Sequence, residues 1–238
     1  MSEGAAPPQC VILAGGLATR LGARAQSLPK ALVPIAGRPF ADLQLSWLGA
    51  EGVTEVVYCI GHRADQIRAY VGCGERWRLA VSYVDEGQDL RGTGGALRLA
   101  LDQGVLAETF AVLYGDSYLR LDLRDVYAAF RSSGRPALMT VLKNDDRWDR
   151  SNAQFENGLV TRYAKGASDD LRWIDYGLSI LTREAVGRIP SEQRADLADL
   201  LGDLSAERQL AGYEASERFY EIGSPEGLAE LERHLGSA

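Results

Sequence analysis

The sequence is short of the residues that form covalent or metal cross-links. It has three cysteines in 238 residues, and none of them belongs to a C-x-x-C pair. An odd number of cysteines without that spacing argues against a disulfide framework and against a structural zinc site. Two of the three, Cys10 and Cys59, lie inside apolar runs that are typical of buried strands. We therefore expect a fold that depends on its hydrophobic core.

Long apolar runs and an excess of positive charge are also missing. No run approaches the length needed to cross a bilayer, and residues 1–9 lack the basic and apolar regions of a secretion signal. The formal net charge is −7, so no overall positive field attracts nucleic acid or an anionic membrane. We expect a cytoplasmic protein without a nucleic-acid or membrane partner. Any polyanionic ligand must then be held by a local group of basic residues.

What the sequence does contain is a regular alternation of short apolar runs and longer amphipathic stretches, which is typical of β-α-β units. The Asn157-Gly158 dipeptide predicts a hairpin turn between strands at 153–156 and 159–163. We expect a single α/β domain whose Rossmann-like sheet is mixed but mostly parallel, with helices on its faces and a small antiparallel insertion. Further strands are predicted at 10–14, 55–60, 80–84, 110–114, 137–142, 176–181 and 219–222. Helices are predicted at 40–51, 64–71, 95–101, 123–132, 183–189, 197–210 and from Ser224 onward.

The strongest functional signal follows the first predicted strand, where a Gly-Gly pair is succeeded by Arg20 and Lys30. Glycines at the carboxyl end of a parallel strand let backbone N–H groups approach phosphate oxygens, although such a pair also occurs in purely structural turns. The two cations favour the phosphate interpretation, and the spacing fits neither a P-loop nor a dinucleotide fingerprint. We expect Arg20 and Lys30 to be catalytic. The residues expected to bind a nucleotide here are Leu13, Ala14, Gly15, Gly16, Thr19 and Arg20.

Two later motifs add to this signal. Gly92-Thr93 comes just before the helix predicted at 95–101, and the backbone groups of threonine and glycine can contact a base edge without charge. A helix start that is capped by the threonine is an alternative explanation of the Gly92-Thr93 motif. Asp116 directly follows an apolar strand, and its carboxylate is a hard oxygen ligand that suits magnesium. A turn or cap residue is the alternative for Asp116.

Together these motifs resemble those of the sugar-1-phosphate nucleotidyltransferases, written A-G-G-x-G-T-R with a later P-K, L-G-T-G-G-A and G-D. The resemblance covers nearly the whole chain and implies the nucleotide-diphospho-sugar transferase fold. It also implies an NTP and a sugar 1-phosphate as substrates and Mg²⁺ as cofactor. Residues 10–135 would form the nucleotide-binding half and residues 136–238 the sugar-phosphate-binding half, with residues 1–9 flexible.

The same resemblance assigns roles to residues outside the nucleotide loop. Asp116 would be the principal magnesium ligand and a catalytic residue, and Glu221 stands where the family's D-I-G-T-P-E motif has a second metal carboxylate. Lys165 resembles the lysine that holds the sugar phosphate, and Glu86 aligns with an acidic residue at the sugar pocket, although both could be solvated loop charges. A sugar-binding segment is expected at Asp175, Tyr176 and Gly177.

The implied reaction is an in-line displacement in which a sugar-phosphate oxygen attacks the α-phosphorus of the NTP and pyrophosphate leaves. The A-G-R-P-F run at 36–40 and the R-G-T-G-G-A run look most like those of D-glycero-D-manno-heptose 1-phosphate guanylyltransferases, which favours GTP. N-acetylmuramate 1-phosphate uridylyltransferases share the architecture, so UTP comes next, and CTP and dTTP stay open. Ala18 and Glu221 depart from the family pattern. A module that binds a nucleotide or sugar nucleotide without turnover therefore also remains open.

Overall fold

The computed structural model describes residues 7–16, 28–164 and 170–236, and the statements below concern these residues. Thr19, Arg20 and Lys165, for which the sequence predicts roles, lie outside the described residues, as does Ala18. The described part of the chain contains no helix that is long and apolar enough to span a membrane.

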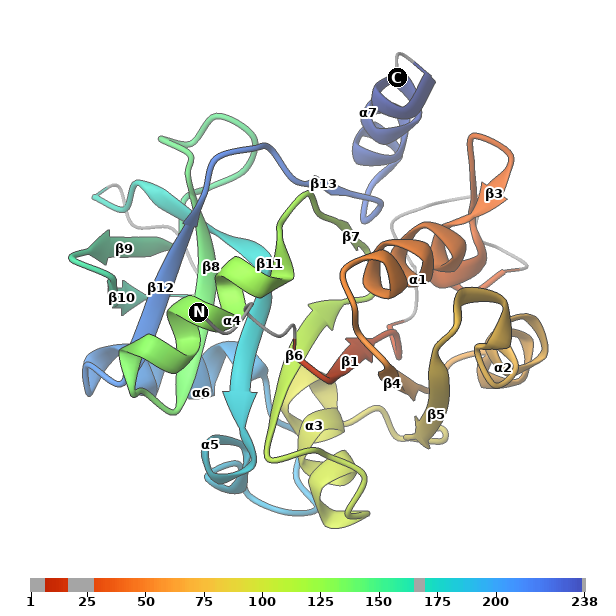
Figure 1. Ribbon diagram of the computed structural model, residues 1–238, viewed down its shortest axis with the longest axis horizontal. Helices are drawn as coiled ribbons and strands as arrows, with labels where there is room; N and C mark the ends of the chain where they lie inside the picture. Colours follow the sequence, from red (N-terminus) through yellow and green to blue (C-terminus); the bar gives the residue numbers. More distant parts are fainter. Residues whose placement is uncertain (1–6, 17–27, 165–169, 237–238) are drawn as a thin grey trace.

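Nine of the described strands form one large sheet in the order β5-β4-β1-β6-β11-β8-β12-β10-β9 (Figure 1). Its first half is parallel and consists of β1 (Gln9–Leu13), β4 (Glu55–Ile60), β5 (Ala80–Asp85) and β6 (Thr109–Tyr114). The strands β4, β1 and β6 each lie between two neighbours and are almost continuously apolar, because helices cover both of their faces. This half agrees with the prediction from the alternating pattern. Gln9, which was expected to lie in a flexible terminus, is buried at the start of β1.

The second half of the sheet differs from the prediction. β11 (Trp173–Thr182) runs antiparallel to both β6 and β8 (Ala137–Lys143), and β12 (Leu210–Ala215) runs parallel to β8. β9 (Ala153–Glu156) pairs with β10 (Leu159–Tyr163) and also with β11, so that five strands close on themselves. The sheet is mixed, as predicted, but this half is mostly antiparallel and closed, which the prediction of a mostly parallel sheet with a small insertion did not include.

A glycine explains how the five strands can close. A Cβ on Gly212 in β12 would lie 2.5 Å from the Phe155 ring, so glycine leaves the room that this ring of β9 occupies against β12. The hairpin turn itself is confirmed, because Asn157 and Gly158 both have positive φ, at 51° and 77°. The strand β12 was missed because its glycine and its short length resemble a helix end followed by a loop.

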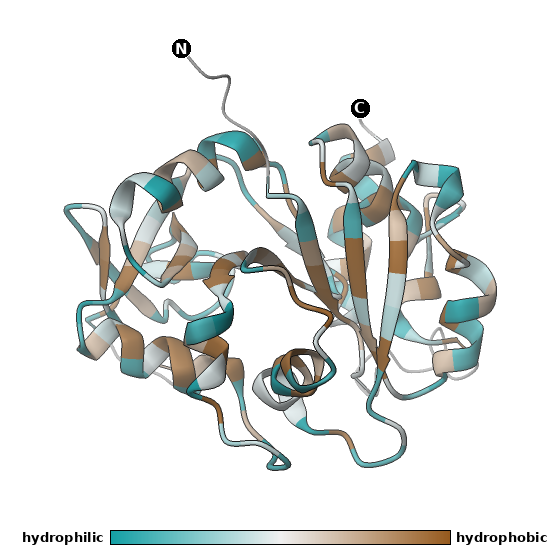
Figure 2. Cartoon of the chain, turned by 60° about the horizontal axis from the view of Figure 1, so that its bottom comes forward, coloured by the Kyte–Doolittle hydropathy of each residue, from teal (hydrophilic) through white to brown (hydrophobic). Residues whose placement is uncertain are grey.

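Helices cover both faces of the sheet. The core on one face contains residues of α1 (Phe40–Ala50), α2 (Ala64–Val71) and α4 (Leu123–Ser133), and the core on the other contains residues of α3 (Gly92–Asp102), α5 (Arg183–Gly187) and α6 (Leu197–Ala206). Strand residues alternate between these cores, because successive side chains of a strand point to opposite faces. Figure 2 accordingly shows hydrophobic residues along the strands, whereas the helices carry both hydrophobic and hydrophilic residues.

The last helix, α7 (Pro225–Gly236), packs through a third apolar cluster and lies at the periphery of the molecule (Figure 1). Ser224 begins this helix as predicted, since its hydroxyl accepts a hydrogen bond from Gly227 N at 3.1 Å. Directly before the helix, β13 (Tyr220–Glu221) pairs with β7 (Ser117–Tyr118), which follows β6. This pairing brings residues about a hundred positions apart to the same edge of the sheet. A further short pair is formed by β2 (Pro34–Ile35) and β3 (Arg38–Pro39), and 3-10 turns occur at η2 (Lys30–Leu32) and η3 (Glu75–Trp77).

Candidate active site

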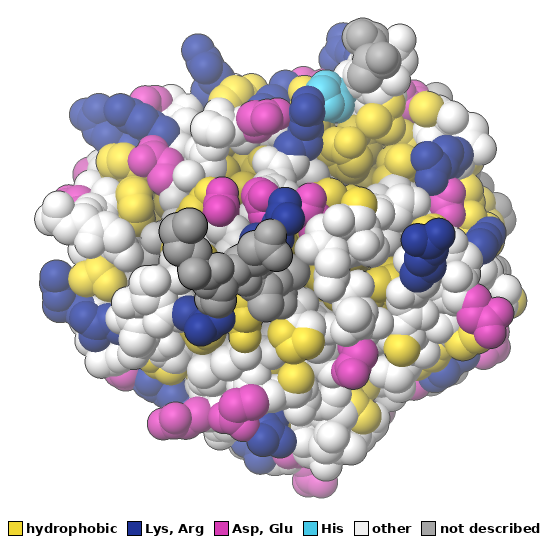
Figure 3. Space-filling view, viewed as in Figure 1, with side chains coloured by type: hydrophobic (Ala, Val, Ile, Leu, Met, Phe, Trp, Pro, Cys, Tyr) yellow, Lys and Arg dark blue, Asp and Glu magenta, His cyan; other side chains and the backbone are white. Residues whose placement is uncertain are grey.

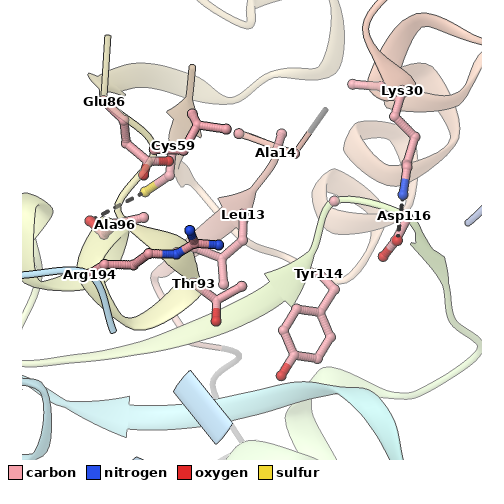
Figure 4. Close-up of a pocket in the computed structure, with 16 residues that line it drawn as sticks. Leu13, Ala14, Lys30, Cys59, Glu86, Thr93, Ala96, Tyr114, Asp116 and Arg194 are labelled. Carbon is pink, nitrogen blue, oxygen red and sulfur yellow. Dashed lines mark hydrogen bonds and ion pairs between the residues drawn. The ribbon is translucent and has the colours of Figure 1, made fainter. Parts of the chain in front are cut away.

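A cavity of about 370 Å³ opens at the carboxyl ends of β1, β4 and β6 (Figure 4). Ligands of open α/β sheets bind at this edge, because the loops after parallel strands meet there. The cavity is lined by Leu13, Ala14, Gly15, Gly16, Lys30, Ala31, Cys59, Glu86, Leu90, Gly92, Thr93, Ala96, Tyr114, Gly115, Asp116 and Arg194.

The structure brings most of the predicted nucleotide-site residues to this one cavity. The predicted residues that line it are Leu13, Ala14, Gly15, Gly16, Lys30, Glu86, Gly92, Thr93 and Asp116. Four other predicted residues that the structure describes lie outside the lining, namely Asp175, Tyr176, Gly177 and Glu221. Glu86 was expected at the sugar pocket, and it lines the same cavity as Gly15 and Gly16.

One end of the cavity is charged. Lys30 Nζ donates to Asp116 Oδ2 at 2.9 Å, and the two side chains are 20% and 27% exposed. Gly115, directly before Asp116, packs so closely on β1 that a Cβ would lie 2.5 Å from the Leu13 carbonyl oxygen. This close contact explains why the residue before Asp116 is a glycine. It also holds the Asp116 backbone beside Leu13 and Ala14 at the end of β1.

Glu221 reaches the same end from the other direction. β13 places it opposite Ser117, and Ile222 N donates to the Asp116 carbonyl oxygen at 2.9 Å. A Cβ on Gly223 would lie 3.6 Å from Asp116 Oδ2, 4.0 Å from Glu221 Cδ and 4.0 Å from Lys30 Nζ. Two carboxylates and one ammonium group therefore surround a single point on the rim that carries the glycine loop.

The donors at this point fit magnesium. In the described part of the chain, no group of three or more His, Cys, Asp or Glu side chains is placed to hold a metal ion. Mg²⁺ needs no such cage, since it is usually bound by one or two carboxylates together with substrate phosphates and water. Asp116 and Glu221 supply two hard oxygen donors of this kind. They fit an ion that arrives with a nucleotide.

The opposite end of the cavity combines apolar walls with three polar side chains, those of Glu86, Thr93 and the exposed Arg194 (Figure 4). Its apolar walls include Leu13, Cys59 and Ala96, and Glu86 lies near them (Figure 4). Glu86 Oε2 accepts a hydrogen bond from Arg91 N at 2.7 Å. Burial is the main cause that raises the pKa of Glu86, and the nearby Asp85 charge adds to it, whereas the Arg91 contacts oppose the rise.

The Gly92-Thr93 motif has a structural task that the sequence did not reveal. The Thr93 hydroxyl donates to Asp196 Oδ1 and accepts from Leu197 N, both at 2.9 Å. The N–H groups of Gly94 and Gly95 both donate to the Ala195 carbonyl oxygen, at 3.0 and 3.1 Å. The Thr93 hydroxyl thus holds a distant segment, while Gly92 and Thr93 still line the cavity.

That distant segment delivers Arg194 to the cavity, and sequence reasoning missed it. Arg194 lies in the connection between α5 and α6, and its stem packs near Gly92. No recognisable motif surrounds it in the sequence. Its position depends on hydrogen bonds to a turn about a hundred residues earlier, which a local pattern cannot show.

Asp175 acts on the cavity only through a neighbour. Its carboxylate accepts hydrogen bonds from Gly177 N at 2.9 Å, Tyr163 Oη at 3.2 Å and Tyr114 Oη at 3.4 Å. Burial raises the pKa of Asp175 to about 6, even though these three donors oppose the rise. Tyr114 lines the cavity, so Asp175 fixes the orientation of a wall residue.

The other two residues of the predicted sugar segment are occupied in packing. The Tyr176 side chain is fully buried against Phe219, with ring centroids 5.5 Å apart. Gly177 has a φ of +101°, and a Cβ there would lie 2.8 Å from Ser117 Oγ. The Tyr176 ring is thus unavailable to a sugar, which corrects that expectation. The sequence pattern was misinterpreted because the residue types of this segment suit a buried strand as well as a sugar-binding segment.

The fold and the cavity are those of an α/β protein that holds its ligand at the carboxyl edge of a Rossmann-like sheet. Residues 10–216 match the model of the MobA-like NTP transferase domain, and the chain belongs to that family. The resemblance drawn from the sequence motifs is confirmed.

Known relatives are named as transferases of different nucleotides. The D-glycero-alpha-D-manno-heptose 1-phosphate guanylyltransferase of Campylobacter jejuni is 26% identical over 92% of this chain and 96% of that protein. The UTP–glucose-1-phosphate uridylyltransferase of Synechocystis is 28% identical over 82% of this chain, which spans 54% of that protein. The structure of HddC from Yersinia pseudotuberculosis complexed with GMP-PN has a TM-score of 0.76 at 24% identity and covers 95% of this chain and 99% of that one. This last likeness shows a shared fold.

Proposed function

We propose that this chain condenses a sugar 1-phosphate with an NTP to give an NDP-sugar and pyrophosphate, with Mg²⁺ as cofactor and GTP as the first candidate nucleotide. The convergence of Lys30, Asp116 and Glu221 at the charged end of the cavity carries the proposal. Family membership and the names of the guanylyl- and uridylyltransferase relatives support it. UTP, CTP and dTTP are the alternatives.

The chemistry asks for positioning and charge neutralisation. The attacking phosphate oxygen of the sugar is already ionised, so no general base is required, and the barrier falls when the reacting groups are aligned and the developing charge is compensated. Lys30 has three N–H donors, so its ammonium group can keep Asp116 and still donate to phosphate oxygens. The backbone of Gly15 and Gly16 supplies further donors at the cavity wall.

Asp116 and Glu221 would hold the magnesium ion, which when bound supplies positive charge to the phosphate oxygens. Outside the described residues, Thr19 and Arg20 are proposed to complete the nucleotide loop, and Lys165 to hold the sugar phosphate. Asp175 is proposed to shape the sugar side through Tyr114. Each role agrees with the implied reaction of the sequence motifs.

The test is a pyrophosphate-release assay with the four common NTPs and a panel of sugar 1-phosphates. Release should need both substrates, and EDTA should abolish it. Removing one charged phosphate or metal contact typically lowers the rate by about 30- to 1000-fold, so Lys30→Ala and Asp116→Ala should lose activity to that extent. Glu108→Ala is the matched control, because Glu108 is an exposed acid that precedes β6, at the opposite end of the strand from Asp116.

Two results would count against the proposal. Unchanged turnover in Asp116→Ala, with the control variant also active, would remove Asp116 from the site. Nucleotide binding without pyrophosphate release across the whole panel would instead identify a binding module.

A further inference from the structure

Helix α1 buries one polar side chain among its apolar ones. Its buried residues are Phe40, Ala41, Gln44, Leu45 and Leu48, and Gln44 is only 2% exposed. Burying an amide costs free energy unless its N–H and C=O groups find partners. The partners of Gln44 therefore indicate what this glutamine does in the fold.

The amide nitrogen of Gln44 bonds to the turn that carries Asp116. Gln44 Nε2 donates to the Tyr114 carbonyl oxygen at 3.0 Å and to the Ser117 carbonyl oxygen at 2.9 Å. These two residues flank Gly115 and Asp116, so that one amide group bridges both sides of the turn. The reverse orientation of the amide would place its oxygen against two carbonyl oxygens, so the partners fix the orientation.

The same turn has two further anchors, both from the backbone. Gly115 N donates to the Leu13 carbonyl oxygen at 3.0 Å, and Ile222 N donates to the Asp116 carbonyl oxygen at 2.9 Å. Strand β1 and the segment after β13 thus hold the turn on two sides, and α1 holds it on a third. Of these three supports, only the one from Gln44 comes from a side chain, so a substitution can remove it.

The other half of the Gln44 amide is unsatisfied. Among the described residues, Gln44 Oε1 is buried and has no hydrogen-bond donor. An unpaired buried acceptor opposes folding. The favourable contribution of this amide therefore comes from the two hydrogen bonds that it donates to the turn.

Helix α1 also supports the cation of the site. Phe40 N, at the first turn of α1, donates to the Val33 carbonyl oxygen at 3.0 Å, and Val33 directly follows η2, which begins with Lys30. Apolar residues of η2 and α1 belong to the same core. Helix α1 therefore fixes the segments that carry Lys30 and Asp116 relative to each other.

We propose that Gln44 is a positioning residue for magnesium, because by holding the turn it keeps the Asp116 carboxylate where it can share a metal ion with Glu221. The inference rests on the proposed function, which makes Asp116 and Glu221 the metal ligands. Gln44 does not line the cavity, so it acts through Asp116. A turn that is already fixed loses little conformational freedom when the metal ion binds. Groups that orient metal ligands in this way are typically worth about 10- to 100-fold in metal affinity or activity.

The test replaces Gln44 by methionine, which has a similar length and lacks both the donors and the unpaired oxygen. Gln9→Met is the matched control. Gln9 is a buried glutamine that also donates to a backbone carbonyl oxygen, that of Val105 at 3.0 Å, but it begins β1, at the opposite end of the strand from the cavity. Gln44→Asn, whose amide is one methylene shorter, should behave as Gln44→Met does and replaces it if the methionine variant does not fold.

The first measurement is the rate of pyrophosphate release over a range of free Mg²⁺ concentrations, with both substrates saturating. In Gln44→Met, the Mg²⁺ concentration that gives half of the maximal rate should rise by about 10- to 100-fold, and the maximal rate itself should fall much less. Gln9→Met should keep the Mg²⁺ dependence of the wild type, whatever stability it loses. The wild-type Mg²⁺ dependence in Gln44→Met would overturn the proposal.

The second measurement is binding without turnover. Thermal shifts are recorded with each of the four common NTPs, in EDTA and at rising Mg²⁺, and the nucleotide that gives the largest shift is used. Gln44→Met should keep the shift seen in EDTA and need about 10- to 100-fold more Mg²⁺ for the further gain.

The controls separate this inference from the proposed function. The same Mg²⁺ requirement in Gln44→Met, Gln9→Met and the wild type would overturn the role of Gln44 while leaving the transferase reaction in place. A wild-type protein without turnover and without any Mg²⁺-dependent shift would instead remove the proposed function, and this inference with it.

Discussion

Two aspartates near the cavity show how their neighbours set the behaviour of a residue. Asp116 faces the ammonium group of Lys30, whereas Asp175 faces only the neutral donors of Gly177, Tyr163 and Tyr114. Those donors do not offset the loss of water, and the pKa of Asp175 rises to about 6. The charge of Asp116 is thus balanced by a partner, while that of Asp175 costs stability.

This difference predicts how stability changes with pH. Because the pKa of Asp175 is about 6 in the folded protein and its ordinary value is 3.8, the native state binds more protons than the unfolded state between these values. The free energy of unfolding should therefore fall as pH rises through that window, and stay lower above it. Asp175→Asn is neutral at every pH and keeps an oxygen for Gly177 N. It should be more stable than the wild type by about 1 to 3 kcal/mol at pH 7.5.

Urea unfolding from pH 4 to pH 7.5 measures this effect. The advantage of Asp175→Asn should shrink as the pH falls toward 4, where the wild-type carboxyl is protonated. Asp89→Asn, at an exposed position, should show no such trend. A difference that stays constant over the whole range would contradict the raised pKa of Asp175.

Much of the candidate site could be predicted from local sequence motifs. The features that could not be predicted have a common cause. The predicted residues Gly15, Gly16, Lys30, Glu86 and Asp116 do line one cavity. The side of the cavity on which Glu86 lies, and the presence of Arg194, depend on packing between segments far apart in the chain. A motif shows which residue types occur in order, and packing decides which ligand group each one faces.

Among the elements, the starts of α3 and α6 are clamped together. Thr93 at the first turn of α3 bonds Asp196, which is also the N-cap of α6, and Ala195 N donates to the Arg91 carbonyl oxygen at 2.9 Å. One hydroxyl therefore serves two helices. It also fixes the connection that carries Arg194.

Thr93→Val tests this clamp, because valine keeps the shape and removes the hydroxyl. Leaving the Asp196 carboxylate and Leu197 N without this partner should cost about 1 to 3 kcal/mol, measured by urea unfolding. Amide hydrogen exchange should rise at 194–198. Ser191→Ala removes an exposed hydrogen bond to Asp102 in the same connection and should have little effect on stability. Equal stability of Thr93→Val and the wild type would show that the clamp is unimportant.

The elements themselves were largely predictable, since apolar periodicity indicates strands and helices locally. The exceptions are pairings that periodicity does not encode. The contact of Ala153 with Trp173, which closes the five strands, and the pairing of Glu221 with Ser117 both join distant segments. Strand direction and closure follow from such contacts, so the parallel half was predicted and the closed half was not.

At the scale of the whole molecule, an open parallel half and a closed five-strand half meet at the β6–β11 pairing. The cavity lies on the open half, and the hydrogen bond from Tyr114 to Asp175 connects its wall to the closed half. Acidic and basic side chains are interspersed on the face seen in Figure 3. With a net charge of −7, the protein must attract a triphosphate by local groups such as Lys30 and not by its overall field.

The most direct measurement is a crystal structure of the protein with Mg²⁺ and a GTP analogue that cannot be cleaved between the α- and β-phosphates. We predict that Lys30 contacts the phosphates and that Asp116 and Glu221 share the metal ion. A nucleotide bound in the reverse direction, or outside this cavity, would contradict it.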